Sequence, residues 1–349
     1  MNDRPSFFCL GWSGNTTVIS EMTRGRRFFV VGGAGFIGSH IIDYLLNSNT
    51  TLTVTIFDNF SSGRAWHFKE HLSDERLKVI RGDVKDVTAL RRGMEGHEVV
   101  VHLASNPDIA RAIIEPEIDF REGTLLTQNV VEAMRSSSAK RILYSSGSGV
   151  YGDIGDIEPS EDYGPLIPIS TYAASKLAGE ALISAYCHMF GLSACVFRFA
   201  NVVGPRQTHG VGYDFVRKLL ADPTRLKILG DGNQSKSYIH VTDVVNAIFT
   251  ANEKTVKPYE AYNVATGDYV TVKEIADLAV ECLGLVPTSA RYEFTGGRGG
   301  WKGDVPVVRF NTERIRKLGW APRMNSREAL RDSMLSMISD MKKEQDGKL

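Results

Sequence analysis

The chain has 349 residues, of which 42% are hydrophobic and 23% charged, a balance typical of a globular protein with one large or two closely packed domains. Its 41 basic residues match its 41 acidic ones, which excludes a bulk positive charge for binding nucleic acid or a membrane surface. No apolar run approaches the roughly 20 residues of a membrane-spanning helix. The four cysteines form no CxxC pair, so we expect a reduced, cytoplasmic protein.

Residues 25–203 alternate between short apolar runs and stretches of helical spacing. The apolar runs predict buried strands at 28–31, 52–57, 79–80, 99–101 and 142–144. Helical stretches lie between them, at 86–94 and 115–136. This alternation predicts an α/β domain whose parallel sheet is covered by helices on both faces. Residues 1–24 show no clear period, and we expect a mobile extension there.

The alternation breaks after residue 203, where glycine-rich turns separate the predicted helices. Helical spacing recurs at 213–221, 272–283 and 326–342. The last stretch places four apolar residues on one face: Leu330, Met334, Met337 and Met341. We therefore predict a smaller lobe over 204–349, from which a segment near 238–252 returns to the first domain.

A glycine-rich turn follows the first predicted strand and opens the first predicted helix. Gly32, Gly35 and Gly38 have separate tasks: a tight turn, close approach of a pyrophosphate, and packing of the helix on the sheet. Phe36 and Ile37 begin the helix, whose free N–H groups and dipole attract phosphate. Such a turn alone is also compatible with a loop that binds nothing, so the residues that follow decide.

An acidic residue at the end of the second predicted strand supports dinucleotide binding. Asp58 lies 20 residues after Gly38, where a carboxylate accepts hydrogen bonds from the adenosine ribose. The same carboxylate repels the 2′-phosphate of NADP, so NAD is the predicted cofactor, although Arg64 nearby could pair with a phosphate. Asp83 follows the third strand, where it either meets the adenine amino group or is a plain turn residue.

Tyr172 and Lys176 carry the main signal for chemistry. Their i, i+4 spacing places them on one face if the segment is helical. A tyrosine with its free pKa of about 10 is a poor base, but a neighbouring ammonium favours the phenolate, which could accept a hydroxyl proton near neutral pH. A bare YxxxK more often marks an exposed helix face, yet here it follows a complete dinucleotide pattern.

Together these segments resemble the extended short-chain dehydrogenase/reductase family, and within it the NAD-dependent nucleotide-sugar epimerase/dehydratase branch, with the UDP-hexose 4-epimerases nearest. The resemblance runs from about residue 26 to about residue 341. It rests on these motifs: Gly-Gly-Ala-Gly-Phe-Ile-Gly (32–38), Asp58-Asn59, Gly82-Asp83, His102-Leu103-Ala104, Val150-Tyr151-Gly152, Tyr172…Lys176, Asn201-Val202-Val203-Gly204-Pro205-Arg206, Tyr238-Ile239-His240-Val241 and Gly319-Trp320.

The resemblance implies a Rossmann fold, a doubly wound parallel sheet, beside a smaller C-terminal α/β lobe that binds substrate. It implies epimerisation at the sugar C4 through a transient 4-keto intermediate, with NAD retained between cycles. Lys176 is expected to reach the nicotinamide ribose. The further cofactor contacts that it implies are Asn59, Ser61, Gly63, Asp83, Val84, Leu103, Ala104, Ser105 and Ser146. A homodimer is also expected, in which helices near 115–136 and 169–188 form a four-helix bundle.

The loop before Val150 distinguishes the reactions of this branch. The resembling 4,6-dehydratases carry Thr-Asp-Glu there, and the related decarboxylases keep a Glu, whereas this chain has Gly147-Ser148-Gly149. Dehydration and decarboxylation are therefore disfavoured. Epimerases usually have Ser or Thr at the position of Gly147, so we predict that Ser148 replaces the missing hydroxyl, unless water fills the gap.

Substrate contacts follow from the resemblance more loosely. Asn201 matches the family residue that meets the diphosphate, and Lys236 stands where an Arg is usual, which keeps the charge but loses the bidentate fork. Trp301 occupies the place of another diphosphate-binding Arg, so Arg298 is the predicted replacement. Asp304 is a further candidate. The expected partner is a nucleotide-sugar, and neither nucleic acid nor a membrane.

Two other functions stay open at this point. One is another NAD-dependent nucleotide-sugar oxidoreductase, either a decarboxylase or a net dehydrogenase. The other is a non-catalytic NAD-binding protein, which Gly147 favours and the Tyr172/Lys176 pair opposes. His67 and His71 are spaced i, i+4 without a suitable third ligand, so we predict no metal and a solvated helix surface.

Overall fold

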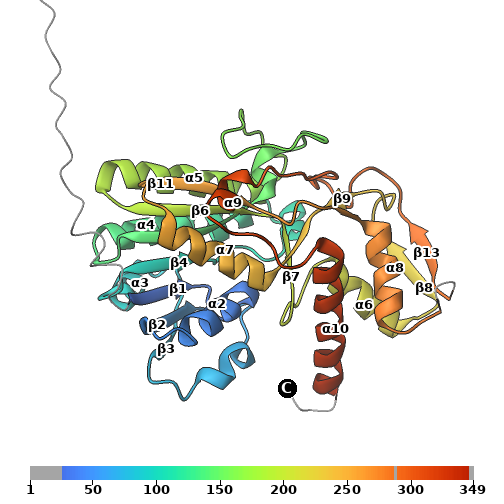
Figure 1. Cartoon of the computed structure of the whole chain (residues 1–349), viewed down its shortest axis with the longest axis horizontal. Coiled ribbons are helices and arrows are strands. Elements are labelled where there is room, and N and C mark those ends of the chain that lie inside the picture. The colour runs from blue at the N-terminus through green and yellow to red at the C-terminus, as the bar shows by residue number, and fades with distance from the viewer. Residues whose placement is uncertain (1–25, 287–288, 346–349) are drawn as a thin grey trace, which may run out of the picture.

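A seven-stranded parallel sheet forms the centre of the larger part of the protein (Figure 1). The computed structural model describes residues 26–286 and 289–345, so the predicted extension 1–24 lies outside the described residues. The strands of this sheet are β1 (Arg26–Val31), β2 (Thr51–Asp58), β3 (Leu77–Arg81), β4 (Val99–His102), β5 (Arg141–Gly147), β6 (Ser193–Phe199) and β11 (Tyr259–Val264). Their order is β11-β6-β5-β4-β1-β2-β3, and the chain changes direction between β1 and β4, where open α/β sheets bind ligands.

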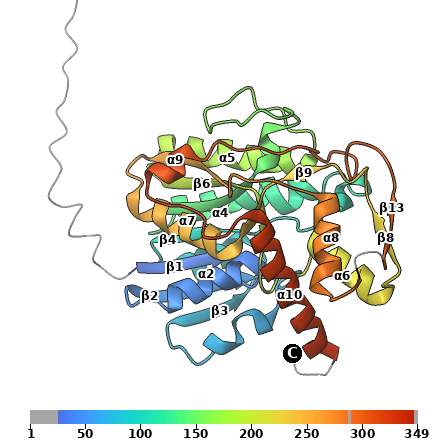
Figure 2. The same ribbon diagram turned by 45° about the vertical axis from the view of Figure 1, so that its right-hand side comes forward.

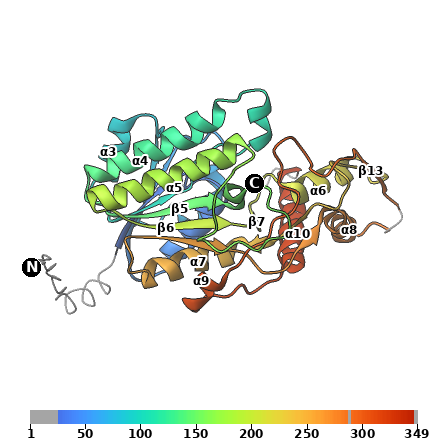
Figure 3. The ribbon, with the colours of Figure 1, turned by 90° about the horizontal axis from the view of Figure 1, so that it is seen from above.

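Helices cover both faces of this sheet (Figure 3). One face carries α3 (Val87–Met94), α4 (Leu125–Arg135) and α5 (Thr171–Phe190). The other face carries α2 (Phe36–Leu46), the 3-10 segment η1 (Ala65–His71), α7 (Val241–Lys254) and α9 (Glu313–Lys317). Three short helical turns join these elements: η2 (Ile109–Ile113), η3 (Phe120–Thr124) and η4 (Ser148–Tyr151).

Alternate side chains of the central strands supply the two apolar cores. In β1, Phe28 and Val30 pack with α2 and α7, whereas Phe29 and Val31 pack with α3 and α4. All four are buried, which explains the continuous apolar run in the sequence. The five predicted strands and the helix at 86–94 are confirmed, as is the doubly wound Rossmann fold.

The predicted helix at 115–136 is confirmed from residue 118 to residue 135, but a π-helical turn interrupts its regular spacing. The regular helix α4 begins at Leu125 and is preceded by η3, a π-helical turn over Phe120–Thr124. At this turn the backbone lies directly on α5, because a Cβ on Gly123 would collide with the Ser175 hydroxyl. Apolar spacing does not reveal one extra residue in a helical turn, and π-turns of this kind concentrate at functional sites.

The smaller lobe packs its own core at the carboxyl edge of the sheet (Figure 2). Its helices are α6 (Val211–Ala221), α8 (Val272–Cys282) and α10 (Ser326–Gln345). Its strands form three pairs: β7 (Asn201–Val203) with β10 (Tyr238–His240), β9 (Ser235–Lys236) with β12 (Val270–Thr271), and β8 (Arg225–Ile228) with β13 (Arg291–Phe294). The predicted helices at 213–221, 272–283 and 326–342 are confirmed, and Leu330, Met334 and Met337 are buried on one face of α10.

The chain crosses between the two parts more than once. After β10 it enters α7, which packs beside α2, and then β11, which pairs with β6 at the edge of the large sheet. Strand β12 and helix α8 return it to the smaller lobe. Among the described residues, no helix combines the length and the apolar character that crossing a bilayer requires.

A buried ion pair links α5 to β6. Arg198 donates to Glu180 at 2.7 Å, and the two side chains are 6% and 4% exposed. Arg198 also donates to the Tyr151 hydroxyl at 2.9 Å, and Glu180 accepts from Ser146 at 2.6 Å. Each charge therefore has several partners, which is the condition under which a buried ion pair is tolerated.

Removing one member of this pair should destabilise the protein strongly. In Arg198→Met the Glu180 carboxylate stays buried without its counter-ion, and we expect the free energy of unfolding to fall by about 3–5 kcal/mol. Arg27→Met is the matched control, because Arg27 and Glu98 form a half-exposed pair and its loss should cost about 1 kcal/mol or less. Urea denaturation of both variants measures the difference; equal losses would contradict the argument.

Candidate active site

The glycine turn between β1 and α2 is built for close approach of a ligand. Gly32 has a φ of +80°, and a Cβ there would lie 2.8 Å from the amide nitrogen of Ala104. A Cβ on Gly38 would lie 2.7 Å from the Gly32 carbonyl oxygen. Helix α2 begins at Phe36 without a side-chain cap, so its first N–H groups, including that of Ile37, point toward the turn. These features fit a dinucleotide pyrophosphate.

Asp58, at the end of β2, lies beside this turn and binds its backbone. Its two carboxylate oxygens accept from the amides of Ala34 at 3.0 Å and Phe60 at 2.8 Å. A Cβ on Gly63 would lie 3.1 Å from the same carboxylate, so glycine keeps the loop close to it. An ionised carboxylate has about four lone-pair sites, which leaves acceptors for the ribose hydroxyls.

The loops after β2 and β3 meet at the same edge of the sheet. The Asn59 amide donates to Asp83 at 3.5 Å, and the backbone amide of Ser61 donates to Asn59 at 3.0 Å. Val84 is buried, and its carbonyl accepts from Asn129 at 3.1 Å. The structure therefore brings together four candidate residues for the adenosine half of the cofactor.

The loop after β4 connects the glycine turn to helix α5. Leu103 and Ala104 donate their amides to the Val31 carbonyl at 2.9 and 3.2 Å, which folds this loop over the turn. The next residue, Ser105, hydrogen-bonds the side chain of Tyr172. The glycine turn and Tyr172 are thus joined by three consecutive residues, 103–105.

Tyr172 and Lys176 lie on one inward face of α5, as predicted. Ser170 caps this helix by accepting from the Ala173 amide at 3.2 Å, so the helix starts just before Tyr172. The Lys176 Nζ lies 5.5 Å from the centroid of the Tyr172 ring and donates to the Ser145 carbonyl at 2.8 Å. Lys176 is buried, and Tyr172 is half-buried.

Burial dominates the titration of both groups. It raises the pKa of Tyr172, and the hydrogen bond from Ser105 offsets only part of that effect. It lowers the pKa of Lys176 to about 8. The Lys176 ammonium is predicted to favour the phenolate of Tyr172, and in the protein without cofactor the desolvation of that phenolate opposes its ionisation. A further positive charge near the phenol would favour its ionisation.

The loop at the end of β5 contains a serine hydroxyl that is already hydrogen-bonded, followed by a glycine with empty space beside it. The Ser146 hydroxyl donates to Glu180, so toward a cofactor it can act only as an acceptor. A Cβ on Gly147 would meet no atom within 4 Å. Ser148 begins η4 and is half-buried, next to this open space.

Two predicted substrate residues of the smaller lobe bind each other. Lys236 and Asp304 form an ion pair at 2.6 Å, and the Lys236 ammonium lies 5.2 Å from the centroid of the Trp301 indole. The Asn201 amide donates to the Ser237 carbonyl at 3.3 Å. Arg298 is exposed in the glycine-rich loop, where its charge lowers the pKa of Asp231 after the hydrogen bonds from Asn233.

A cavity of about 440 Å³ lies between the cofactor loops and the smaller lobe. Its walls are Ser62, Arg64, Pro107, Asp108, Ile109, Ala110, Thr208, His209, Gly210 and Trp301. None of these residues except Arg64 and Trp301 stood out in the sequence, because they come from four separate loops with no shared spacing. Burial lowers the pKa of His209, which keeps its imidazole neutral in this cavity.

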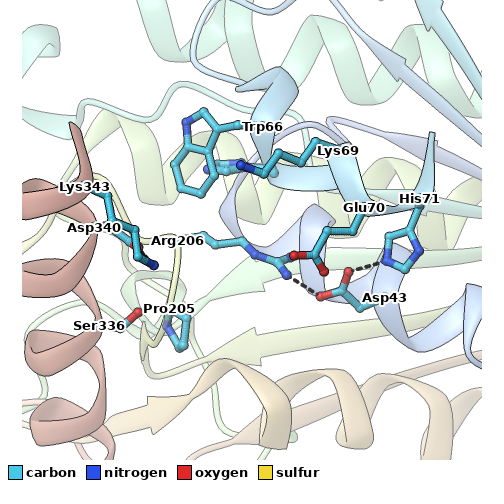
Figure 4. Close-up of a pocket in the computed structure, with 11 residues that line it drawn as sticks. Asp43, Trp66, Lys69, Glu70, His71, Pro205, Arg206, Ser336, Asp340 and Lys343 are labelled. Carbon is cyan, nitrogen blue, oxygen red and sulfur yellow. Dashed lines mark hydrogen bonds and ion pairs between the residues drawn. The ribbon is translucent and has the colours of Figure 1, made fainter. Parts of the chain in front are cut away.

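A second cavity, of about 230 Å³, lies between α2, η1 and α10 (Figure 4). Here Asp43 pairs with Arg206 at 2.8 Å and with His71 at 2.8 Å. His67 is 3% exposed, and its Nδ1 hydrogen-bonds the Ala34 carbonyl at 2.8 Å. The predicted solvated surface for His67 is wrong, because η1 packs on α2 and supports the turn from this side.

Comparisons with known proteins agree with this geometry. Residues 28–265 match the NAD dependent epimerase/dehydratase family. A UDP-glucose 4-epimerase of Mycolicibacterium smegmatis is 33% identical over 312 residues, which are 87% of this chain and 96% of that protein. A dTDP-glucose 4,6-dehydratase of Actinoplanes sp. is 28% identical over 315 residues, 88% of this chain and 96% of that protein.

A solved structure has a similar fold over most of this chain. The Thermus thermophilus UDP-glucose 4-epimerase in complex with NAD has a TM-score of 0.78 at 28% identity, and the match covers 89% of this chain and 99% of that one. In this chain, the same fold carries the glycine turn, the acidic residue at the end of β2 and the Tyr172/Lys176 pair. The chain therefore belongs to the NAD-dependent epimerase/dehydratase family of enzymes, and NAD is its cofactor.

Proposed function

We propose that the protein is a UDP-hexose 4-epimerase, which interconverts UDP-glucose and UDP-galactose or their N-acetyl forms through a transient 4-keto sugar. The observation that carries this proposal is the loop over residues 145–152 beside the catalytic pair, which contains hydroxyls and glycines but no carboxylate. Removing water from a sugar requires an acid and a base at neighbouring carbons. Epimerisation requires one base, a hydride carrier and room for the sugar to turn.

The chain's own residues would handle the proton. When bound, NAD supplies the hydride chemistry at C4 and a positive charge near the phenol. That charge opposes the effect of burial, so Tyr172 can ionise, accept the proton of the C4 hydroxyl and return it when the ketone is reduced. Lys176, held at the Ser145 carbonyl, keeps two further N–H groups for the nicotinamide ribose.

The substrate diphosphate would bind at the edge of the smaller lobe. An ammonium has three donors, and Asp304 takes one of those of Lys236, so Lys236 can still reach a phosphate. Asn201, at the start of β7, donates to the carbonyl of Ser237, the residue after Lys236. Arg298 lies in the loop that follows β13. The cavity under Trp301 has the size of a small ligand, which supports a nucleotide-sugar substrate.

We also infer a homodimer through α4 and α5 in a reducing, cytoplasmic setting. Apolar side chains stand exposed at the ends of this pair, with Phe120 at 61%, Met189 at 72% and Phe190 at 42% exposed. Among the described residues, Cys187, Cys195 and Cys282 are free thiols, which fits a reducing compartment. Sedimentation velocity on the purified protein tests the assembly, and a monomer at micromolar concentration would refute it.

Replacing Tyr172 by phenylalanine tests the proposed function directly. Tyr172→Phe removes the proton acceptor, so we expect the turnover of UDP-galactose to UDP-glucose without added NAD to fall at least about 100-fold. Tyr292→Phe, on β13 at the far end of the smaller lobe, is the control and should keep the wild-type rate. Product analysis by NMR across UDP-, GDP- and dTDP-sugars separates epimerisation from dehydration. Unchanged turnover in Tyr172→Phe would refute the mechanism, and steady release of NADH would indicate a net dehydrogenase.

The open position at Gly147 gives a second test. Its φ of −158° is extended backbone, and a Cβ meets no neighbour, so Gly147→Ser should keep the unfolding free energy within about 0.5 kcal/mol. A new hydrogen bond to the reacting oxygen should raise kcat about five-fold. Ser148→Ala should lower kcat in the wild type and have no effect in the Gly147→Ser background. A wild-type rate for Ser148→Ala alone would show that Ser148 has no catalytic role.

A further inference from the structure

Asp119 is a buried carboxylate beside the catalytic pair. Only 1% of its surface is exposed, and each carboxylate oxygen has its own donor. The Asn106 amide donates to Oδ1 at 2.8 Å, and the Thr171 hydroxyl donates to Oδ2 at 2.7 Å. Both partners are uncharged, so neither hydrogen bond brings a counter-ion to this buried carboxylate.

The two donors are the sequence neighbours of Ser105 and Tyr172, whose side chains contact each other. Asn106 directly follows Ser105, and Thr171 directly precedes Tyr172. Ser105 and Tyr172 are themselves hydrogen-bonded. Asp119 therefore forms a second bridge between the loop after β4 and the first turn of α5. Its two partners are the sequence neighbours of Ser105 and Tyr172, which form the first bridge.

The π-helical turn η3 holds Asp119 against α5. Asp119 immediately precedes this turn, and Gly123 within it lies against the hydroxyl of Ser175. Ser175 is the residue before Lys176. A Cβ at position 123 would collide with the Ser175 hydroxyl oxygen, so the glycine is what lets η3 approach α5 this closely. The irregular backbone thus sets the position of Asp119 relative to both members of the pair.

The charge of Asp119 acts on both catalytic groups in the same direction. It raises the pKa of Lys176 against the larger, opposite effect of burial, and it adds to the effect of burial in raising the pKa of Tyr172. Among the described residues, Asp119 is the acidic side chain whose charge raises the pKa of Lys176.

The other titratable groups that face the pair do not replace this charge. From β4, His102 is neutral, because burial and the Lys176 ammonium lower its pKa to about 3. From β5, burial raises the pKa of Tyr144, so its phenol is also neutral. On α5 itself, Glu180 is paired with Arg198.

We infer that Asp119 is a positioning residue of the Tyr172/Lys176 pair, which ties the first turn of α5 to the loop after β4 and places a fixed negative charge beside both side chains. The inference rests on the proposed function for its kinetic consequence only. The bridge from Asn106 through Asp119 to Thr171 keeps Tyr172 within reach of Ser105. The charge of Asp119 favours the ammonium form of Lys176 in a site that desolvates it. An exposed acid could do neither, because water would screen it and it would hold no fixed geometry.

Asp119→Asn separates the charge from the hydrogen bonds. An asparagine oxygen can accept from Asn106 while its NH2 group donates to the Thr171 hydroxyl, so both links survive without the charge. Loss of the negative charge should lower the pKa values of Tyr172 and Lys176 together. We expect the acid and the alkaline limbs of the pH profile of kcat to move to lower pH by roughly half a unit or more. Glu117→Gln, an exposed acid two residues away, is the matched control and should move neither limb.

Thr171→Val tests the tie alone, since it keeps the charge and removes one hydrogen bond. We expect kcat to fall about ten-fold with both limbs of the profile in place and with KM changed less than kcat. An unchanged kcat in Thr171→Val would overturn the positioning role. A lower rate in Asp119→Asn without movement of either limb would overturn the role of the charge.

A readout without turnover keeps this inference apart from the proposed function. The phenolate of Tyr172 is titrated by ultraviolet difference absorbance in NAD-loaded protein, with Tyr172→Phe subtracted in each background. In Asp119→Asn the phenolate should form at lower pH than in the wild type. If the wild type does not epimerise UDP-galactose but this shift is present, the proposed function fails and the role of Asp119 stands. If the wild type epimerises and the shift is absent, the inference about Asp119 fails.

Discussion

The packing of the loop after β4 on the glycine turn is the contact on which the site depends. Ala104 packs so closely on Gly32 that a side chain at position 32 would collide with the Ala104 backbone. The Val31 carbonyl holds the same loop by accepting the amides of Leu103 and Ala104. The glycine turn and Tyr172 are consequently linked through one short stretch of backbone. The two contacts lie one residue apart, because Ser105, which meets Tyr172, directly follows Ala104, which lies on Gly32.

Local spacing in the sequence predicted the parts of the site that lie on one element. The glycine turn, Asp58 at the end of β2, and the i, i+4 pair on α5 could all be placed, since one strand or helix fixes each of them. Contacts between distant segments could not be predicted. The bridge from Asn106 to Thr171 through Asp119 joins three elements, and the pairing of Lys236 with Asp304 spans 68 residues. No periodicity encodes such contacts, and the π-helical turn that aligns Asp119 breaks the periodicity itself.

Desolvation sets the electrostatic character of the site. Tyr172 and Lys176 are both shifted toward their neutral forms, which is the opposite of what their adjacency in the sequence suggests. Charges that enter or surround the pocket therefore have large effects, because little water is present to screen them. The same reasoning applies to Glu180 and Arg198, whose mutual neutralisation keeps a second acid from acting on the pair.

The path of the chain limits how this architecture can be divided. Strand β11 completes one edge of the large sheet only after the polypeptide has built much of the smaller lobe, and α7 covers a face formed far earlier in the sequence. A fragment that stops after β7 would lack an edge strand and leave apolar side chains of β6 bare. Recombining lobes between relatives would therefore require two exchanged segments with matched junctions, since one crossover point would cut through a shared core.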